Sequence, residues 1–381
     1  MRSRCYSINQ FVAVSKTLCR PIIAGLLLAV TTTHGADSPA KFLGAPSCGS
    51  SGCHGGGGAK QNQFLVWSVK DFHSQRPTAT LTTARSKQIA DALEIKDPTA
   101  DARCTTCHAP LHDVAENLRG ENFKVSEGVS CESCHGAAEN WLRSHTRHDY
   151  TRADRTAAGM RDLQNLYVRA NTCVACHQVV SQPLLKAGHP ELIFELDGQS
   201  VAEPKHWSAE KNGNGAQAWL VGQAVALREM EWQIANTQEP DEKLHARKEA
   251  LFWLMQKISA VDSSYPAPSF LHTKYIPATV QKWADDLARA TAENWSAENS
   301  RKALEILAAT KGDFQNISGE LLARRAERLV LALDRLLAAE KNHKADAELN
   351  QLFKLAQSLP DFDPKPFAEA LEKFSAALNA P

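Results

Sequence analysis

The chain has 381 residues, with 43 acidic and 43 basic side chains, so its formal net charge is zero. A chain without an excess of basic side chains has few groups that could neutralise phosphates, and this argues against nucleic acid as a partner. Its hydrophobic content of 43% is typical of a packed globular protein, and its length suits one large domain or two ordinary ones.

The N-terminal segment has the pattern of a secretory signal peptide. Residues 1–20 contain four basic residues and no acidic one, and the short apolar run PIIAGLLLAV follows. We expect cleavage near Gly35–Ala36 and export, to the periplasm or elsewhere outside the cytoplasm. The alternative is a retained membrane anchor, but the run is short for a bilayer span. The mature chain would carry 39 basic and 43 acidic residues and no membrane span.

Eight of the ten cysteines lie beyond this segment, in four pairs that are each followed at once by a histidine. Three pairs read C-x-x-C-H, the signature of c-type haem attachment. Two thiols bond to the vinyl groups of one porphyrin, and the histidine binds the iron as its proximal ligand. We therefore predict four covalently attached haem c groups. The predicted residues are Cys48, Cys53 and His54; Cys104, Cys107 and His108; Cys131, Cys134 and His135; and Cys173, Cys176 and His177.

The first pair, in CGSSGCH at residues 48–54, has four residues between its cysteines instead of two. Two of the four are glycines, which would let the loop bulge while both sulfurs reach one porphyrin. The alternative at this pair is a disulfide that leaves His54 free. For all four pairs, zinc binding, disulfides and thioredoxin-like redox chemistry are the rival interpretations, and none of them requires the histidine after every pair.

A second axial histidine closes a haem iron to small molecules and favours simple electron transfer. The candidates for this distal position are His73, His145 and His189, with His112 and His148 as weaker candidates. Each could instead be an ordinary solvated or hydrogen-bonded histidine. We expect a ligating imidazole to donate its other N–H to a carbonyl or carboxylate. His206 could reach a haem only if the C-terminal helices pack closely on the haem region.

The order of these motifs resembles the tetrahaem cytochrome c-554 family across about residues 43–200. The segments that carry the resemblance are WSVKDFH at residues 67–73, GVSCESCHGAAENWLRSH at 128–145 and CVACH at 173–177. The chain departs from the family pattern in its longer first motif and in the segment beyond residue 200.

The resemblance implies a mostly helical, loop-rich wrapper around stacked pairs of haems. It implies that His73 and His145 are distal ligands and that a histidine after the fourth motif, here His189, is another. It also implies that the second haem is five-coordinate. In that case His108 has no protein ligand opposite it, and His112 is a bystander.

Beyond residue 205 the chain has no cysteine, and apolar residues recur at helical spacing. Such helices have to bury their apolar faces, which favours an α-helical bundle. The predicted fold class is mainly α, with a signal peptide at 1–35, a loop-rich tetrahaem cytochrome c domain at 36–205 and an α-helical domain at 206–381. The predicted C-terminal helices cover residues 216–236, 242–261, a segment from about 277, 296–310, 317–340, about 343–358 and 364–379.

We predict an exported tetrahaem c-type cytochrome that transfers electrons between periplasmic redox partners through stacked haems. The expected partners are other cytochromes and membrane quinol-linked or terminal oxidoreductases. Two alternatives stay open. One is a haem enzyme that reduces a small nitrogen or sulfur oxide at a five-coordinate haem. The other is a subunit of a larger multihaem assembly, in which the C-terminal helices could form an oligomer interface. We favour an electron carrier over a catalyst.

Overall fold

The structure is a computed structural model that describes residues 39–58, 61–74, 76–206, 215–237, 241–261, 266–269, 275–314, 319–340, 343–357 and 361–379. Residues 40–381 form one compact unit. The predicted signal peptide lies outside the described residues, as do Cys5 and Cys19.

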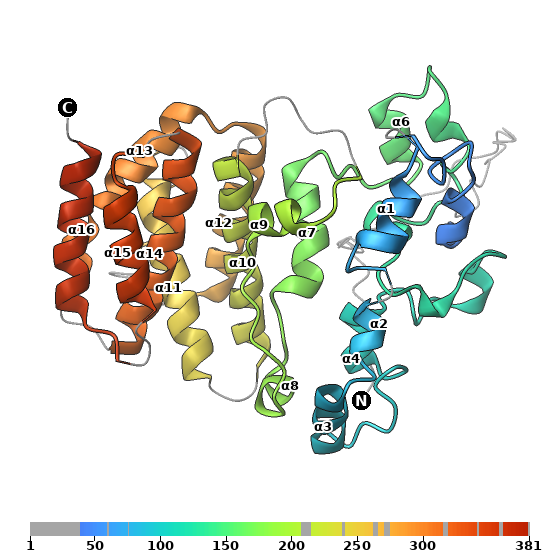
Figure 1. Ribbon diagram of the computed structural model, residues 1–381, viewed down its shortest axis with the longest axis horizontal. Coiled ribbons are helices and arrows are strands. Elements are labelled where there is room, and N and C mark those ends of the chain that lie inside the picture. Colours follow the sequence, from blue (N-terminus) through green and yellow to red (C-terminus); the bar gives the residue numbers. More distant parts are fainter. Residues whose placement is uncertain are drawn as a thin grey trace, which may run out of the picture. The chain divides into compact units, whose positions relative to one another are not determined.

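Sixteen α-helices make up most of the described residues, which confirms the mainly α fold class (Figure 1). The described β-pairing is one isolated parallel bridge between Phe42 and Arg119. Short 3-10 helices lie at Ala45–Cys48, Glu116–Leu118, Val125–Glu127, Ser144–Thr146 and Thr310–Asp313. The α-helices are α1 (Gln63–Lys70), α2 (Arg76–Thr80), α3 (Ala84–Ala92), α4 (Ala102–His108), α5 (Cys131–His135), α6 (Arg152–Ala157), α7 (Leu166–His177), α8 (Gln182–Lys186), α9 (Leu196–Ala202), α10 (Gly215–Asn236), α11 (Glu242–Ser259), α12 (Pro277–Glu293), α13 (Ala297–Ala308), α14 (Gly319–Glu340), α15 (Asp346–Ala356) and α16 (Pro364–Leu378).

The part of the chain up to α9 consists of short helices and long loops. Polar side chains begin the helices that carry the cysteine motifs. Asp101 accepts a hydrogen bond from the Arg103 backbone N–H at the start of α4, and Asn165 accepts one from the Tyr167 N–H at the start of α7. Such caps satisfy N–H groups that have no partner within the helix, so even short helices are well defined at their first turn.

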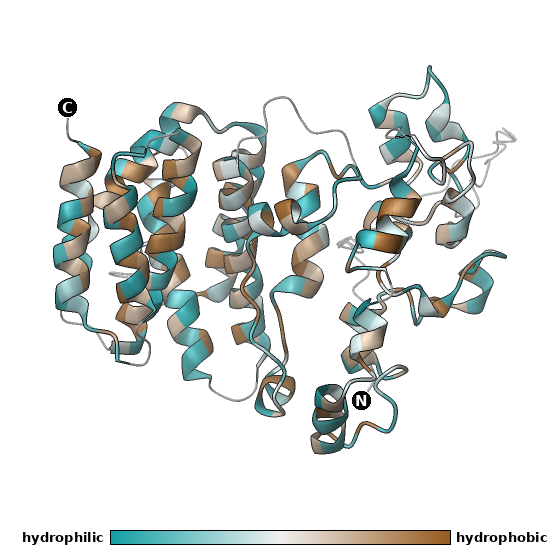
Figure 2. Ribbon diagram, in the orientation of Figure 1, coloured by the Kyte–Doolittle hydropathy of each residue, from teal (hydrophilic) through white to brown (hydrophobic). Residues whose placement is uncertain are grey.

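The helices from α10 to α16 share one hydrophobic core. Each of them overlaps a helix that the sequence predicts. Their apolar stripes are visible as brown bands on the ribbons of Figure 2. α10 lies in the middle of this packing and contacts α11, α12 and α14. Leu220, Leu227 and Leu254 are completely buried there. The described residues contain no helix with the length and apolarity needed to cross a bilayer.

α7 and α9 pack on the helices that follow them. Ala170 and Val174 of α7 and Leu196 of α9 belong to the same hydrophobic core as α10 to α16. α10 contacts both helices directly. The helix that ends on the fourth cysteine motif is therefore held by the C-terminal helices. The division of the chain at residues 205 and 206 stays a prediction.

Candidate haem sites

Three of the four cysteine motifs form the last turn of a helix. α4 ends on His108, α5 on His135 and α7 on His177. In a helix, the histidine lies one turn after the first cysteine, so both thiols and the imidazole occupy adjacent positions on one short segment. We number the sites in chain order. Site 1 has Cys48, Cys53 and His54; site 2 has Cys104, Cys107 and His108; site 3 has Cys131, Cys134 and His135; site 4 has Cys173, Cys176 and His177.

Site 1 reaches a comparable arrangement with its longer loop. Cys48 ends a 3-10 helix, and the backbone N–H of His54 donates to the Cys48 carbonyl at 3.2 Å. This bond joins the same two motif positions that a helical turn would join. A Cβ on Gly55 would lie 1.9 Å from the Gly49 carbonyl oxygen, so the loop closes only because residue 55 is glycine.

Thiols from different sites contact each other. Cys48 of site 1 and Cys131 of site 3 form a side-chain hydrogen bond, which together with burial raises the pKa of the Cys131 thiol. Cys107 of site 2 and Cys176 of site 4 form a second such bond, which raises the pKa of Cys176 in the same way. Sites 1 and 3 are therefore neighbours, and so are sites 2 and 4. None of the eight described cysteines forms a disulfide.

Two proximal histidines face a histidine from a distant segment. The ring centres of His54 and His145 are 6.1 Å apart, and those of His177 and His73 are 6.0 Å apart. A metal binds an imidazole nitrogen at about 2 Å, and the ring centre lies roughly 1 Å behind that nitrogen, so two imidazoles across one iron have centres about 6 Å apart. Both pairs have the spacing of two axial ligands on one metal.

The Nδ1 atom of each of these four histidines contacts a polar group of the protein. The partners are Gln63 Oε1 for His54 (2.9 Å), the Trp141 carbonyl for His145 (3.1 Å), Asp71 Oδ1 for His73 (3.1 Å) and the Gln199 amide for His177 (3.3 Å). Gln199 Oε1 is buried with no hydrogen-bond partner in the described part of the chain, and turning the amide over would let it accept from the His177 N–H. With Nδ1 engaged, Nε2 is left for a metal, as is usual for ligating histidines.

Site 3 lies beside a histidine that the sequence analysis left without an assignment. Burial lowers the pKa of His135 to about 4, and the charges of His206 and His54 lower it further. His135 Nδ1 is buried, and no described residue hydrogen-bonds it. His206 has its Nδ1 3.3 Å from the Pro204 carbonyl, in the segment after α9. The sequence made a haem contact of His206 conditional on close packing of the C-terminal helices, because its position depends on that packing.

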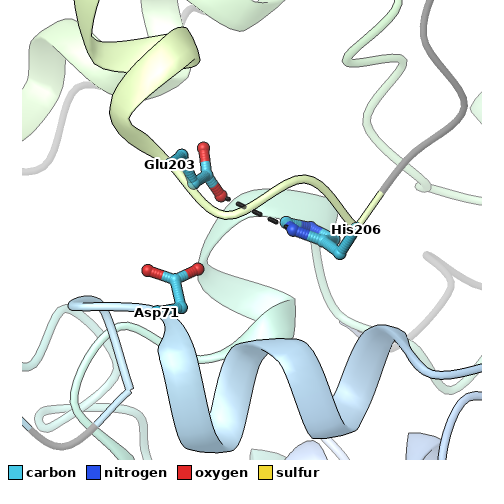
Figure 3. A group of neighbouring side chains, drawn as sticks. All are labelled: Asp71, Glu203 and His206. Atoms are coloured by element: carbon cyan, nitrogen blue, oxygen red, sulfur yellow. Dashed lines mark ion pairs between the residues drawn. The ribbon is translucent and has the colours of Figure 1, made fainter.

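Two carboxylates join the segments that carry His73 and His206. Asp71 directly follows α1, and Glu203 directly follows α9 (Figure 3). The polar atoms of Asp71, Glu203 and His206 all lie within 4.8 Å of one another. The hydrogen bond to Asp71 raises the pKa of His73, and burial raises the pKa of Glu203. Because each carboxylate lies beside a histidine, we interpret them as hydrogen-bonding support for the imidazoles. Nothing in the local sequence singles either acid out.

The remaining candidate histidines differ in their surroundings. His108 of site 2 has its Nδ1 2.9 Å from the Pro77 carbonyl, and His189 has its Nδ1 2.8 Å from the Pro190 carbonyl. His112 is 2.8 Å from the Asp113 carboxylate. His148 is exposed. The structure therefore brings His145, and not His148, to His54.

The arrangement fits covalently bound haem. Each site offers two thiols with a histidine beside them, and two of the sites have a second imidazole at the axial spacing.

A family model described as cytochrome c554 and c-prime matches residues 48–136, which hold sites 1, 2 and 3. Residues 48–136 of the chain are therefore similar to the cytochrome c554 family. Cytochrome c-554 of Nitrosomonas europaea is 28% identical to this chain over 131 residues, which are 33% of this chain and 51% of that protein. The chain thus matches about half the length of this curated relative. No solved structure matches the chain.

The similarity to the cytochrome c554 family supports a c-type cytochrome with covalently bound haem at sites 1, 2 and 3. The matched residues end at Gly136, so site 4 and the helices from α10 onward lie outside them. The number of haems and the distal ligands therefore remain to be argued from the residues themselves.

Proposed function

We propose that this cytochrome carries four haem c groups and transfers electrons between redox partners in the periplasm. The observation that carries the proposal is the pair of facing histidines at the spacing of axial ligands, His54 with His145 and His177 with His73. Haem c, when bound, supplies reversible one-electron oxidation and reduction at its iron. In this proposal His145 is the distal ligand at site 1, His73 at site 4 and His206 at site 3.

Contacts between residues support an order for the sites. The thiol contacts join site 1 to site 3 and site 2 to site 4. Burial and then the charge of Cys173 raise the pKa of the Cys134 thiol to about 12, which supports sites 3 and 4 as neighbours. The order is 1, 3, 4, 2, with sites 1 and 2 at the two ends. A continuous series suits a protein that accepts electrons at one end and donates them at the other.

The protein groups around the imidazoles support electron transfer more than catalysis. Acceptors such as the Asp71 carboxylate and the Trp141 carbonyl fix the orientation of the distal rings and make them better electron donors to a metal. Two protein ligands on an iron leave no position for a substrate. The protein therefore fixes the orientation of the imidazole ligands, and this reduces their movement when an iron gains or loses an electron.

The expected partners follow from charge and location. Export through the predicted signal peptide would leave 39 basic and 43 acidic residues, a mildly acidic protein. Such a surface favours partners with a positive patch, and steering of this kind raises association rates at low salt. Other cytochromes and membrane quinol-linked or terminal oxidoreductases are the proposed donors and acceptors.

The proposal is tested on the exported protein. Intact mass should equal the chain without residues 1–35 plus four haems, and a maleimide should find no free thiol. A potentiometric titration should then show four one-electron steps, and reduced protein should pass electrons to an oxidised acceptor cytochrome. Fewer haems, or thiols that react with the maleimide, would overturn the four-haem proposal. A size measurement in solution tests the alternative of a subunit in a larger assembly.

A further inference from the structure

A buried carboxylate lies inside the cysteine motif of site 3. Glu132 follows Cys131 directly in α5 and is only 1% exposed. A buried carboxylate is costly unless donors surround it. Its Oε1 atom accepts from the backbone N–H groups of Leu43 at 2.9 Å and Ala138 at 2.8 Å, and its Oε2 atom accepts from that of Gly44 at 2.7 Å. One side chain therefore joins α5 to two other segments of the chain.

Two of these N–H groups belong to the segment that leads into site 1. The Ser47 N–H donates to the Gly44 carbonyl at 3.0 Å, and Ser47 Oγ donates to the Leu43 carbonyl at 2.9 Å. These bonds span the start of the 3-10 helix Ala45–Cys48, which ends on the first cysteine of site 1. The position of this cysteine therefore depends on the two residues that the buried carboxylate holds.

The backbone at Gly44 has little room to move away from this carboxylate. Gly44 has φ +85°, and a Cβ on it would lie 2.3 Å from the Asn122 carbonyl oxygen. Only glycine fits such a close approach in this conformation. The next N–H group, that of Ala45, donates to Glu127 Oε2 at 3.0 Å. The segment therefore contacts the loop at Asn122 as well as two carboxylates.

The third N–H group leads to the other side of site 1. The Ala138 carbonyl accepts from the N–H groups of Trp141 at 3.1 Å and Leu142 at 2.8 Å. The Trp141 carbonyl accepts from the His145 backbone N–H at 3.0 Å and lies 3.1 Å from its Nδ1. The Trp141 ring also packs edge-on against the His145 ring, with centres 5.6 Å apart. A bond that fixes Ala138 therefore helps to fix the histidine that faces His54.

We propose that Glu132 is a positioning residue that sets the spacing between the haems of sites 1 and 3. The proposal rests on the four-haem function proposed above. From inside the motif that ends on His135, the carboxylate holds the segments of Cys48 and His145, which lie on two sides of site 1. The distance between the two irons then depends on one side chain. Electron transfer slows steeply as the distance between centres grows, so this spacing bears directly on function.

The first test uses the wild-type protein with its haems counted by mass. Ferric irons that lie close together broaden and split each other's EPR signals, so the oxidised protein should show coupled haem signals. Hydrogen exchange followed by mass spectrometry should find the peptide that contains residues 41–48 protected. Four haems without coupling, or exchange as fast as in an unfolded peptide, would overturn the positioning role alone. Fewer than four haems would overturn the four-haem function.

The second test separates the length of the side chain from its charge. Glu132→Asp keeps the charge but is one methylene shorter, and Glu132→Gln keeps the length but offers one acceptor oxygen instead of two. Both variants should retain four haems, because the residues between the cysteines take no part in attachment. In both, one haem per chain should lose its coupling, because site 1 ends the series and neighbours only site 3. The Leu43 segment should exchange about tenfold faster.

The matched control is Glu139→Gln, which removes the same charge from an exposed acid of the same loop. Glu139 accepts from the Lys41 N–H at 2.8 Å, and its variant should keep the wild-type coupling. Unchanged coupling in both Glu132 variants, whether their only defect is lower stability or a shifted reduction potential, would overturn the proposal. An equal loss of coupling in Glu139→Gln would overturn it as well.

Discussion

At the scale of single residues, the atoms that face away from the metal decide how each imidazole behaves. His73 has a carboxylate at its Nδ1, whereas His54 and His145 have a neutral amide and a carbonyl. A carboxylate draws the proton of an imidazole N–H more strongly than a neutral acceptor does, which makes the ring a stronger donor to iron. The ligand assignment therefore predicts that site 4 depends on Asp71, which lies 3.1 Å from His73.

We expect Asp71→Asn to raise the reduction potential of the haem at site 4. A neutral amide weakens the polarisation of His73, so the ferric form loses stabilisation, by about 59 mV for each tenfold change in relative affinity. Potentiometric titration measures the shift. The matched control is Asp113→Asn, which alters the acid beside His112, 2.8 Å away, and should leave all four potentials unchanged. Equal shifts in both variants would argue against His73 as the ligand.

At the scale of helices, a polar network fastens the helix of site 4 to the C-terminal bundle. The Tyr167 hydroxyl of α7 donates to Asp285 Oδ1 at 2.6 Å and accepts from Arg289 Nη2 at 2.6 Å. Both partners belong to α12. Arg228 of α10 reaches the same Asp285 oxygen at 2.5 Å. Three helices therefore meet at one carboxylate. Because Asp285 and Arg228 are largely shielded from water, the hydrogen bonds between them contribute more to stability than they would in solvent.

We expect Tyr167→Phe to lower the free energy of unfolding by about 2 kcal/mol, because it leaves a partly buried carboxylate without one of its donors. Chemical denaturation followed by far-ultraviolet circular dichroism measures this loss. The haem spectrum should stay unchanged, because the ring and its packing are retained. Tyr150→Phe is the matched control and should cost little, because no described group hydrogen-bonds its hydroxyl. A loss of the same size in both variants would contradict the role of the network.

At the scale of the whole molecule, a mostly buried glutamate connects the segment after site 4 with two C-terminal helices. Glu195 accepts from Gln223 Nε2 of α10 at 3.2 Å and lies 3.5 Å from Arg328 Nη1 of α14. Its other carboxylate oxygen is buried and unpartnered within the described residues. Burial raises the pKa of Glu195 from the ordinary value of 4.5 to about 6, against the charge of Arg328.

The folded protein therefore holds the Glu195 proton more tightly than the unfolded chain does. The resulting stabilisation is fully present below about pH 4.5 and is lost as the pH rises through about 6, a change of about 2 kcal/mol for this group. We expect Glu195→Gln to remove this part of the pH dependence, as measured by denaturation between about pH 4 and pH 7. Glu121→Gln, at an exposed position, should keep the wild-type slope. An unchanged slope in Glu195→Gln would contradict the raised pKa.

The attachment motifs and the helices could be predicted from the sequence. Covalent haem attachment needs two thiols and a histidine within a few consecutive residues, so the whole motif can be read from a short stretch such as CESCH. The helices after residue 215 were predictable for a related reason. Their apolar residues repeat with the period of the helix, and that period is set by backbone geometry alone.

Which candidate distal histidine lies opposite which proximal one depends on the tertiary structure. His145 follows site 3 in sequence but lies against His54 of site 1, and His73 follows site 1 but lies against His177 of site 4. His206 belongs to the segment that leads into the bundle, so its place near His135 depends on long-range packing. The supporting acids Asp71 and Glu203 come from different helices. Contacts between distant segments leave no local period or spacing, and that is why the sequence could name candidates but could not pair them.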